Sequence, residues 1–141
     1  MKAFLDTSVL VPVYYGDQVH HHASLAIFIK LGTSTGCCGT HSLVEVYATL
    51  TRMPGKHPIS GEQAMLFIGD IRERLSIVPL DGDDYGEALK SVAALGIVAG
   101  NIYDALLAHC ASKAKAETIY RWNSRHFAQC GSHVTKRLRT P

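Results

Sequence analysis

The sequence predicts an α/β fold in which helices cover both faces of a parallel β-sheet. Short apolar segments of strand length alternate with longer segments whose apolar residues recur every three or four positions, which is the pattern of βαβ units. A parallel sheet has to be covered on both sides, so helices are expected on each face. With 141 residues, of which 47% are apolar and 18% charged, the chain has the size and composition of one globular domain. We therefore expect residues 1–141 to form a single domain.

The N-terminal part is expected to contain two strands and one helix. Residues 2–5 are a short apolar segment typical of an inner strand, and residues 34–39 are a second candidate. Between them, residues 20–32 have the spacing of a helix that ends at Gly32. The apolar face expected for this helix consists of Leu25, Phe28 and Ile29.

Two further helices are expected in the middle of the chain. Residues 41–55 place apolar side chains at i, i+3, i+4 and i+7 before a Pro-Gly pair ends the helix. These side chains are Leu43, Val46, Tyr47 and Leu50. The next helix begins at Ser60, whose spacing to Gln63 matches a capping box, and continues to about Leu75.

The C-terminal half continues the alternation. Strands are expected at residues 76–80 and 118–122, and helices at residues 83–95 and 101–115, with residues 97–101 as a loop. The sequence shows no internal repeat and no low-complexity linker. This order of elements supports a parallel sheet.

Charge and cysteine content narrow the possible partners and compartment. From Lys113 onward there are seven Lys or Arg residues against one acid, which suits an anionic partner such as nucleic acid; a solvated tail is the alternative. Adjacent Cys37 and Cys38 lie in an apolar segment without a metal-ligand spacing, so they are expected to be buried thiols in a reducing cytoplasm. Asp6 interrupts the first apolar segment, so no secretory signal is expected, and no segment approaches the roughly 20 apolar residues of a membrane span.

Three acidic residues stand out by their position. Asp6 directly follows the first strand, Glu45 opens the helix after the second strand, and Asp104 opens the helix before the last strand. Each has a purely structural alternative. Asp6 is suited to bond the backbone of a turn, Glu45 matches a capping box with Ser42, and a negative Asp104 is favoured by the helix dipole.

Taken together, these residues indicate a metal site. The loops after parallel strands meet at one edge of the sheet, where Asn123, which follows the last strand, would join the three acids. Carboxylates brought that close repel one another unless a cation neutralises them. Oxygen ligands without cysteines or a histidine pair favour Mg²⁺ or Mn²⁺. The sequence therefore predicts that Asp6 faces a divalent metal ion.

Four segments resemble the signature blocks of the PIN domain family, and most closely those of VapC-type toxin ribonucleases. They are LDTSVL, SLVEVYATL, IYDALLAHCA and WNSRHF, and they follow the family's order over nearly the whole chain. The resemblance implies a three-layer α/β/α sandwich around a parallel sheet of four or five strands. It also implies Mg²⁺- or Mn²⁺-dependent cleavage of RNA, a cognate antitoxin protein as partner, and a homodimer.

The resemblance implies a role for each site residue. Asp6, Glu45 and Asp104 carry over as the catalytic acidic triad, with Asp6 and Asp104 as direct metal ligands and Glu45 holding a second ion or aligning the attacking water. Ser8 is expected to support Asp6 by a hydrogen bond. The family often has a fourth acid where Asn123 stands, so the fourth expected ligand is here a neutral amide.

Other classes of protein are weighed against this resemblance. Asn123 favours a PIN-like module that binds RNA or a protein without cleaving it, whereas the three retained acids favour an enzyme. Arg121 stands where the family frequently has a Thr. Ser8 stands where a haloacid-dehalogenase-type phosphatase has a second Asp, and no P-loop motif occurs.

Two aromatic and histidine features remain open on the sequence alone. Trp122 is suited to stack on a base or to pack in the core, and His126 to contact phosphate or to play a structural role. Residues 20–22 are consecutive histidines, which are expected to begin a solvated helix rather than to bind a transition metal.

Overall fold

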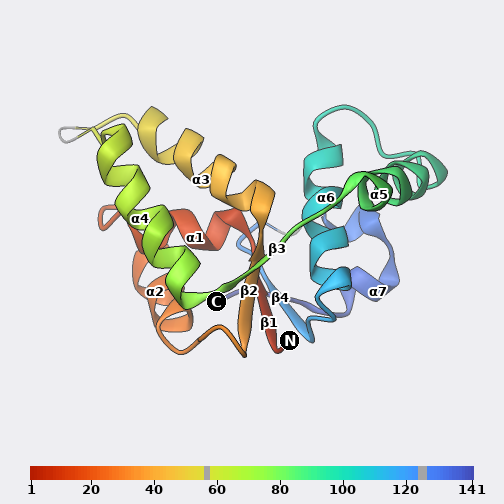
Figure 1. Cartoon of the computed structure of the whole chain (residues 1–141), viewed down its shortest axis with the longest axis horizontal. Helices are drawn as coiled ribbons and strands as arrows, with labels where there is room; N and C mark the ends of the chain where they lie inside the picture. The colour runs from red at the N-terminus through yellow and green to blue at the C-terminus, as the bar shows by residue number, and fades with distance from the viewer. Residues whose placement is uncertain (56–57, 124–126) are drawn as a thin grey trace.

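The computed structural model describes residues 1–55, 58–123 and 127–141. Within these residues, five strands form one sheet in the order β3-β2-β1-β4-β5, and every neighbouring pair is parallel (Figure 1). The strands are β1 (Ala3–Leu5), β2 (Gly36–Gly39), β3 (Ser76–Val78), β4 (Thr118–Tyr120) and β5 (Leu138–Arg139). The predicted α/β class and parallel sheet are confirmed.

Helices cover both faces of the sheet, as predicted. In Figure 1, α1, α2, α3 and α4 lie on one side of the sheet, whereas α5, α6 and α7 lie on the other. The helices are α1 (Thr7–Val13), α2 (His21–Phe28), α3 (Thr40–Arg52), α4 (Gly61–Arg74), α5 (Gly82–Ala94), α6 (Asn101–Lys113) and α7 (Ser132–Thr135), with a 3₁₀ helix η1 (Phe127–Cys130). Within the described ranges, none of them has the length and apolar character needed to cross a bilayer.

Each face of the sheet has its own hydrophobic core. Successive strand residues point to opposite faces, so Phe4 joins the core beneath α5, α6 and α7, whereas Leu5 joins the core beneath α1 to α4. Cys37 and Cys38 of β2 divide between the two cores in the same way. All four cysteines are buried free thiols, as expected for Cys37 and Cys38. The two cores pack against opposite faces of the sheet and so fix the positions at which the carboxyl ends of its strands lie.

Capping side chains set where two of the helices begin. The predicted capping box of α4 is confirmed: Ser60 Oγ accepts a hydrogen bond from the Gln63 N–H (3.1 Å), and Gln63 Oε1 accepts one from the Ser60 N–H (3.0 Å). A second capping box, between Asp81 and Asp84, places the start of α5 at Gly82. These bonds satisfy backbone donors that a helix start otherwise leaves unpaired.

Four elements of the structure were not predicted: α1, α7, β5 and the 3₁₀ helix η1. Helix α1 is buried on nearly all sides and contains Pro12, so it shows no helical alternation of apolar and polar residues. Helix α7 has four residues and β5 has two, which is too short for a recognisable pattern. Because β5 forms, the sheet has the larger of the two expected strand numbers.

Two residues expected on apolar helix faces are exposed. Ile29 is 57% exposed because α2 ends at Phe28 and Ile29 is its C-terminal cap. Tyr47 of α3 is 40% exposed, whereas Val46 and Leu50 are fully buried. The face of α3 that contacts the core is therefore narrower than predicted.

Candidate active site

Asp6 is buried where β1 passes into α1. Its backbone N–H donates to the carbonyl of Tyr120 (3.1 Å), which fastens the end of β1 to the end of β4. Its carboxylate accepts a hydrogen bond from the Ser8 N–H (3.0 Å) and thereby caps α1. Burial raises the pKa of Asp6 above its ordinary value, while Arg121 and the bonds from Ser8 oppose that shift. Asp6 therefore caps the helix after its strand, as the structural alternative expected, and its carboxylate can still belong to the predicted site.

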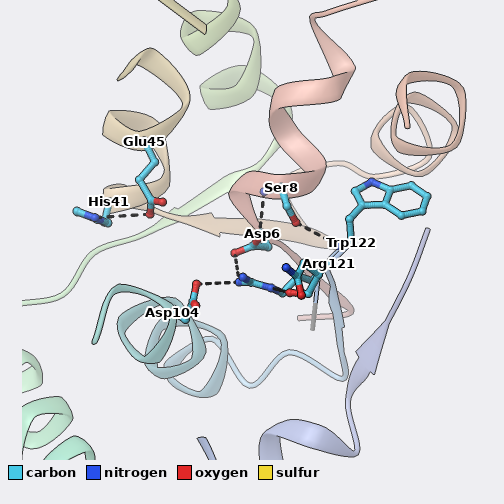
Figure 2. Close-up of polar contacts among 8 residues, drawn as sticks. Asp6, Ser8, His41, Glu45, Asp104, Arg121 and Trp122 are labelled. Atoms are coloured by element: carbon cyan, nitrogen blue, oxygen red, sulfur yellow. Dashed lines mark hydrogen bonds and ion pairs between the residues drawn. The ribbon is translucent and has the colours of Figure 1, made fainter. Parts of the chain in front are cut away.

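A guanidinium group lies between two of the predicted metal ligands. Arg121 Nη1 is 3.2 Å from Asp6 Oδ1 and 3.0 Å from Asp104 Oδ1, as Figure 2 shows. Asp104 lies in the first turn of α6, as predicted, and its side chain is 21% exposed. The cation that faces Asp6 in this structure is therefore Arg121.

From the sequence, Arg121 stood out only as a departure from the family pattern. A positional signal existed, because Arg121 follows β4 directly, as Asp6 follows β1, and these strands are neighbours in the sheet. The guanidinium is held in place by further contacts: it lies over the ring of Phe127, 4.2 Å from the centroid, and its Nε donates to the backbone carbonyl of Asn123. Arg121 is 8% exposed, so it belongs to the interior of the site.

Glu45 approaches the other two acids from α3 (Figure 2). Burial raises its pKa to about 7, and the charges of Asp6 and Asp104 add to that effect while Arg121 opposes it. Its Oε1 atom is buried, lies 3.5 Å from His41 Nε2 and makes no hydrogen bond within the described part of the chain. A buried carboxylate oxygen without a hydrogen bond is costly, and a bound cation would satisfy it.

The predicted capping box between Ser42 and Glu45 is wrong. Helix α3 begins at Thr40 with Gly39 as its N-terminal cap, because β2 leads into the helix without a loop. Ser42 therefore lies inside the helix, where its buried hydroxyl makes no hydrogen bond to the described residues. Glu45 consequently lies beyond the residues that open the helix, and the capping alternative for this acid falls away.

The three acids line one cavity of about 350 Å³. Its lining also includes Ser8, Arg121 and Trp122. The expected convergence of Asp6, Glu45 and Asp104 is thus what the structure has. Asn123 differs: its side chain is exposed and is not among the residues that line the cavity. A direct role for the Asn123 amide in holding a metal stays a prediction.

One wall of the cavity is aromatic. The Trp122 ring stacks on His20, with centroids 3.7 Å apart and an angle of 12° between the planes. Its Nε1 donates to Ser24 Oγ (2.8 Å), and its backbone N–H donates to Ser8 Oγ (3.1 Å). Trp122 therefore packs partly against a core and also lines the cavity. His126 lies outside the described residues.

The donor chemistry of the cavity fits a hard cation. The three carboxylates, among them Glu45 with a buried oxygen that makes no hydrogen bond in the described chain, are ligands that suit Mg²⁺ or Mn²⁺. However, among the residues that the structure describes, no three His, Cys, Asp or Glu side chains are arranged to hold one ion together. The place between Asp6 and Asp104 is taken by Arg121. The residues are therefore of the types that bind a hard cation, but their side chains have to rearrange before they can hold one together.

Comparison with known families agrees with this arrangement. The model of the PIN domain family matches residues 3–129. The chain belongs to the PIN domain family. Among curated PIN-type relatives, ribonuclease VapC40 of Mycobacterium tuberculosis is 30% identical over 116 residues, which cover 82% of this chain and 83% of the relative. Ribonuclease VapC27 of the same organism is 31% identical over 118 residues, covering 83% and 82%.

Solved structures show the same PIN fold. The crystal structure of VapC20 from M. tuberculosis, a toxin that cleaves the sarcin–ricin loop, aligns with a TM-score of 0.72 at 16% identity and covers 90% of this chain and 94% of that one. VapBC2 of Rickettsia felis, bound to a DNA fragment of its promoter, aligns with a TM-score of 0.66 at 20% identity and covers 100% and 99%. The resemblance to VapC-type PIN proteins is confirmed.

Proposed function

We propose that this PIN domain is a Mg²⁺- or Mn²⁺-dependent ribonuclease and the toxin of a VapBC-type toxin–antitoxin pair. The observation that carries the proposal is the meeting of Asp6, Glu45 and Asp104 in one cavity at the carboxyl edge of the sheet. The names of the two curated relatives, both VapC ribonucleases, support RNA as the substrate.

The site residues have distinct tasks in this proposal. Asp104 and Glu45 would hold the ion, with Asp6 beside them at the floor of the cavity. A bound divalent ion supplies Lewis acidity that lowers the pKa of water and offsets charge on the scissile phosphate. Glu45 would also align the attacking water beside the ion. In-line attack by water would leave a 5′-phosphate and a 3′-hydroxyl.

The proposed partners follow from the relatives and from charge. R. felis VapBC2 is a toxin–antitoxin complex, which supports a cognate antitoxin for this chain. Of the basic residues after Lys113, the exposed Lys115, Lys136 and Arg139 are suited to contact RNA phosphates. A homodimer and a cytoplasmic location belong to the same proposal.

A second candidate function rests on Arg121. Its two bonds, to Asp6 and Asp104, supply the site with a cation of its own, as expected of a PIN module that binds RNA or protein without cleaving it. The Glu45 oxygen favours the enzyme, because it is buried without a hydrogen bond in the described chain and a non-catalytic site gains nothing from retaining such a group.

Cleavage of RNA in the presence and absence of metal separates the two functions. We expect purified protein to cut an RNA pool with Mg²⁺ or Mn²⁺, to stop with EDTA, and to leave 5′-phosphates. Asp6→Asn should abolish cleavage while keeping the fold, because Asn is also a good N-terminal cap. Asp83→Asn, which changes an exposed acid of α5, is the matched control and should cleave normally. Cleavage that persists in EDTA would refute the proposal.

A further inference from the structure

Arg121 occupies the position that a bridging metal ion would need. The same nitrogen, Nη1, bonds one oxygen of Asp6 and one oxygen of Asp104. An ion that joins these two carboxylates has to approach each oxygen to about 2.0–2.1 Å, as Mg²⁺ does. The ion and Nη1 cannot both fill the space between those two oxygens. Metal binding to both acids therefore requires Arg121 to move.

The two bonds of Arg121 are not equally accessible to an incoming ion. The Asp6 side chain is 3% exposed and also accepts a hydrogen bond from Ser8, whereas the Asp104 side chain is 21% exposed. Of the two acids that Arg121 bonds, Asp104 is thus the one that solvent ions reach more easily. Glu45, the third acid of the cavity, has an oxygen without a hydrogen bond in the described chain.

Charge balance points to the same division. With all three acids ionised, three negative charges and one guanidinium leave the group with two excess negative charges. A single divalent ion on Asp104 and Glu45 cancels those charges, while Arg121 continues to neutralise Asp6. The backbone of Arg121 is held by its N–H bond to the carbonyl of Arg139 (2.9 Å), so only its side chain has to shift.

We propose that Arg121 is a positioning residue that competes with the divalent ion for Asp104 and retains Asp6 when the ion binds. This inference rests on the proposed function in one respect only, which is that the ion binds in this cavity. Arg121 then sets the ion concentration at which the site loads, because each ion has to displace one bond of the guanidinium. It also replaces a second cation at the buried carboxylate.

Calorimetric titration with Mn²⁺ at pH 8, without RNA, tests the competition. A positive charge within about 4–6 Å of a carboxylate lowers its affinity for a proton by about 1–3 pKa units. The same charge also opposes the binding of a metal cation to that carboxylate. Removing Arg121 should therefore tighten Mn²⁺ binding by about tenfold or more. We expect this for Arg121→Met, and an intermediate affinity for Arg121→Lys, which keeps the charge without the planar fork. If Arg121 served only to stabilise the fold of the site, replacing it would weaken Mn²⁺ binding instead.

Arg137→Met is the matched control. Arg137 also donates side-chain bonds inside the protein, to the carbonyl of Ala116 and the hydroxyl of Ser112, but it does not line the acidic cavity. The Arg137→Met variant should bind Mn²⁺ with the same affinity as the wild type. An affinity of Arg121→Met equal to or weaker than wild type would overturn the proposal.

A second measurement does not depend on the folding of a variant. In a crystal structure of the wild type with Mn²⁺, we expect the ion on Asp104 and Glu45, and Arg121 bonded to Asp6 alone. An ion on Asp104 with both Arg121 bonds intact would overturn the proposal. Since neither measurement contains RNA, a protein that shows the competition but cleaves no RNA would refute the proposed function and leave this inference standing.

Discussion

Helix α6 carries an ion pair at each end, and the two pairs are built differently. At its N-terminal end, Asp104 accepts a bond from buried Arg121 at 3.0 Å. At its C-terminal end, Lys113 Nζ lies 2.6 Å from Asp84 Oδ2 at the surface and also donates to the carbonyl of Pro79. The exposed pair is the shorter one, yet water and salt weaken exposed charges far more than buried ones. Distance alone therefore does not rank the two pairs.

The difference in charge count is more informative. At the surface, one ammonium meets one carboxylate, and the pair lowers the pKa of Asp84 and raises that of Lys113. In the cavity, one guanidinium bonds two of three acids, and the pKa of the third, Glu45, is raised to about 7. A matched pair serves the structure only, whereas a group of acids with too few cations beside it is typical of a functional site.

The largest expected effect distinguishes the two acids at the ends of α6 by catalysis. Asp104→Asn should lower the rate of RNA cleavage by about a hundredfold or more, because it removes a charge that holds the ion. Asp84→Asn should leave the rate unchanged, since Asp84 pairs with Lys113 away from the cavity. Cleavage rates with saturating Mg²⁺ compare them. Equal rates for the two variants would contradict the metal site.

The next effect compares the two cations by stability. Without metal, Arg121→Met should lower the free energy of unfolding by about 3–5 kcal/mol, because it leaves buried Asp6 without a partner and removes the bond to partly exposed Asp104. Lys113→Met should cost far less, and its cost should shrink further when NaCl is raised, because the pair is exposed. Urea unfolding in EDTA, at low and high salt, measures both. A larger cost for Lys113→Met would reverse the comparison.

The smallest effect concerns pH and the third acid. The pKa of Glu45 is raised to about 7 in the folded protein from 4.5, so the folded state binds more protons than the unfolded state between these values. The metal-free protein should therefore lose stability as pH rises from about 5 to above 7, by about 1–2 kcal/mol once solvent screening is allowed for.

Glu45→Gln isolates this contribution. The variant cannot ionise at this position, so its thermal unfolding temperature should exceed that of the wild type at pH 8 and approach it at pH 5. Mg²⁺ should remove the difference at pH 8, because the ion favours the charged form. An identical pH dependence in both proteins would show that Glu45 is not perturbed as the structure indicates.

The acids of the site were predictable from the sequence because their positions are local. Asp6 and Asp104 stand at a strand end and a helix start, and those boundaries appear in apolar spacing and turn residues. Glu45 was placed in the right cavity for a partly wrong reason, since α3 begins at Thr40 and not at a Ser42 cap. The error in the predicted helix start did not change the face of α3 on which Glu45 lies, because the spacing of side chains around a helix is fixed.

The sequence by itself determined the parallel α/β sheet and the three acids that the carboxyl edge brings together. Only the tertiary structure decided what neutralises them. Arg121 reaches Asp6 because β4 lies beside β1, although 115 residues separate the two in the chain. Local patterns report burial and helix ends, which depend on neighbouring residues. The partner of a buried charge depends on strand order, and strand order is fixed by the packing of the whole chain.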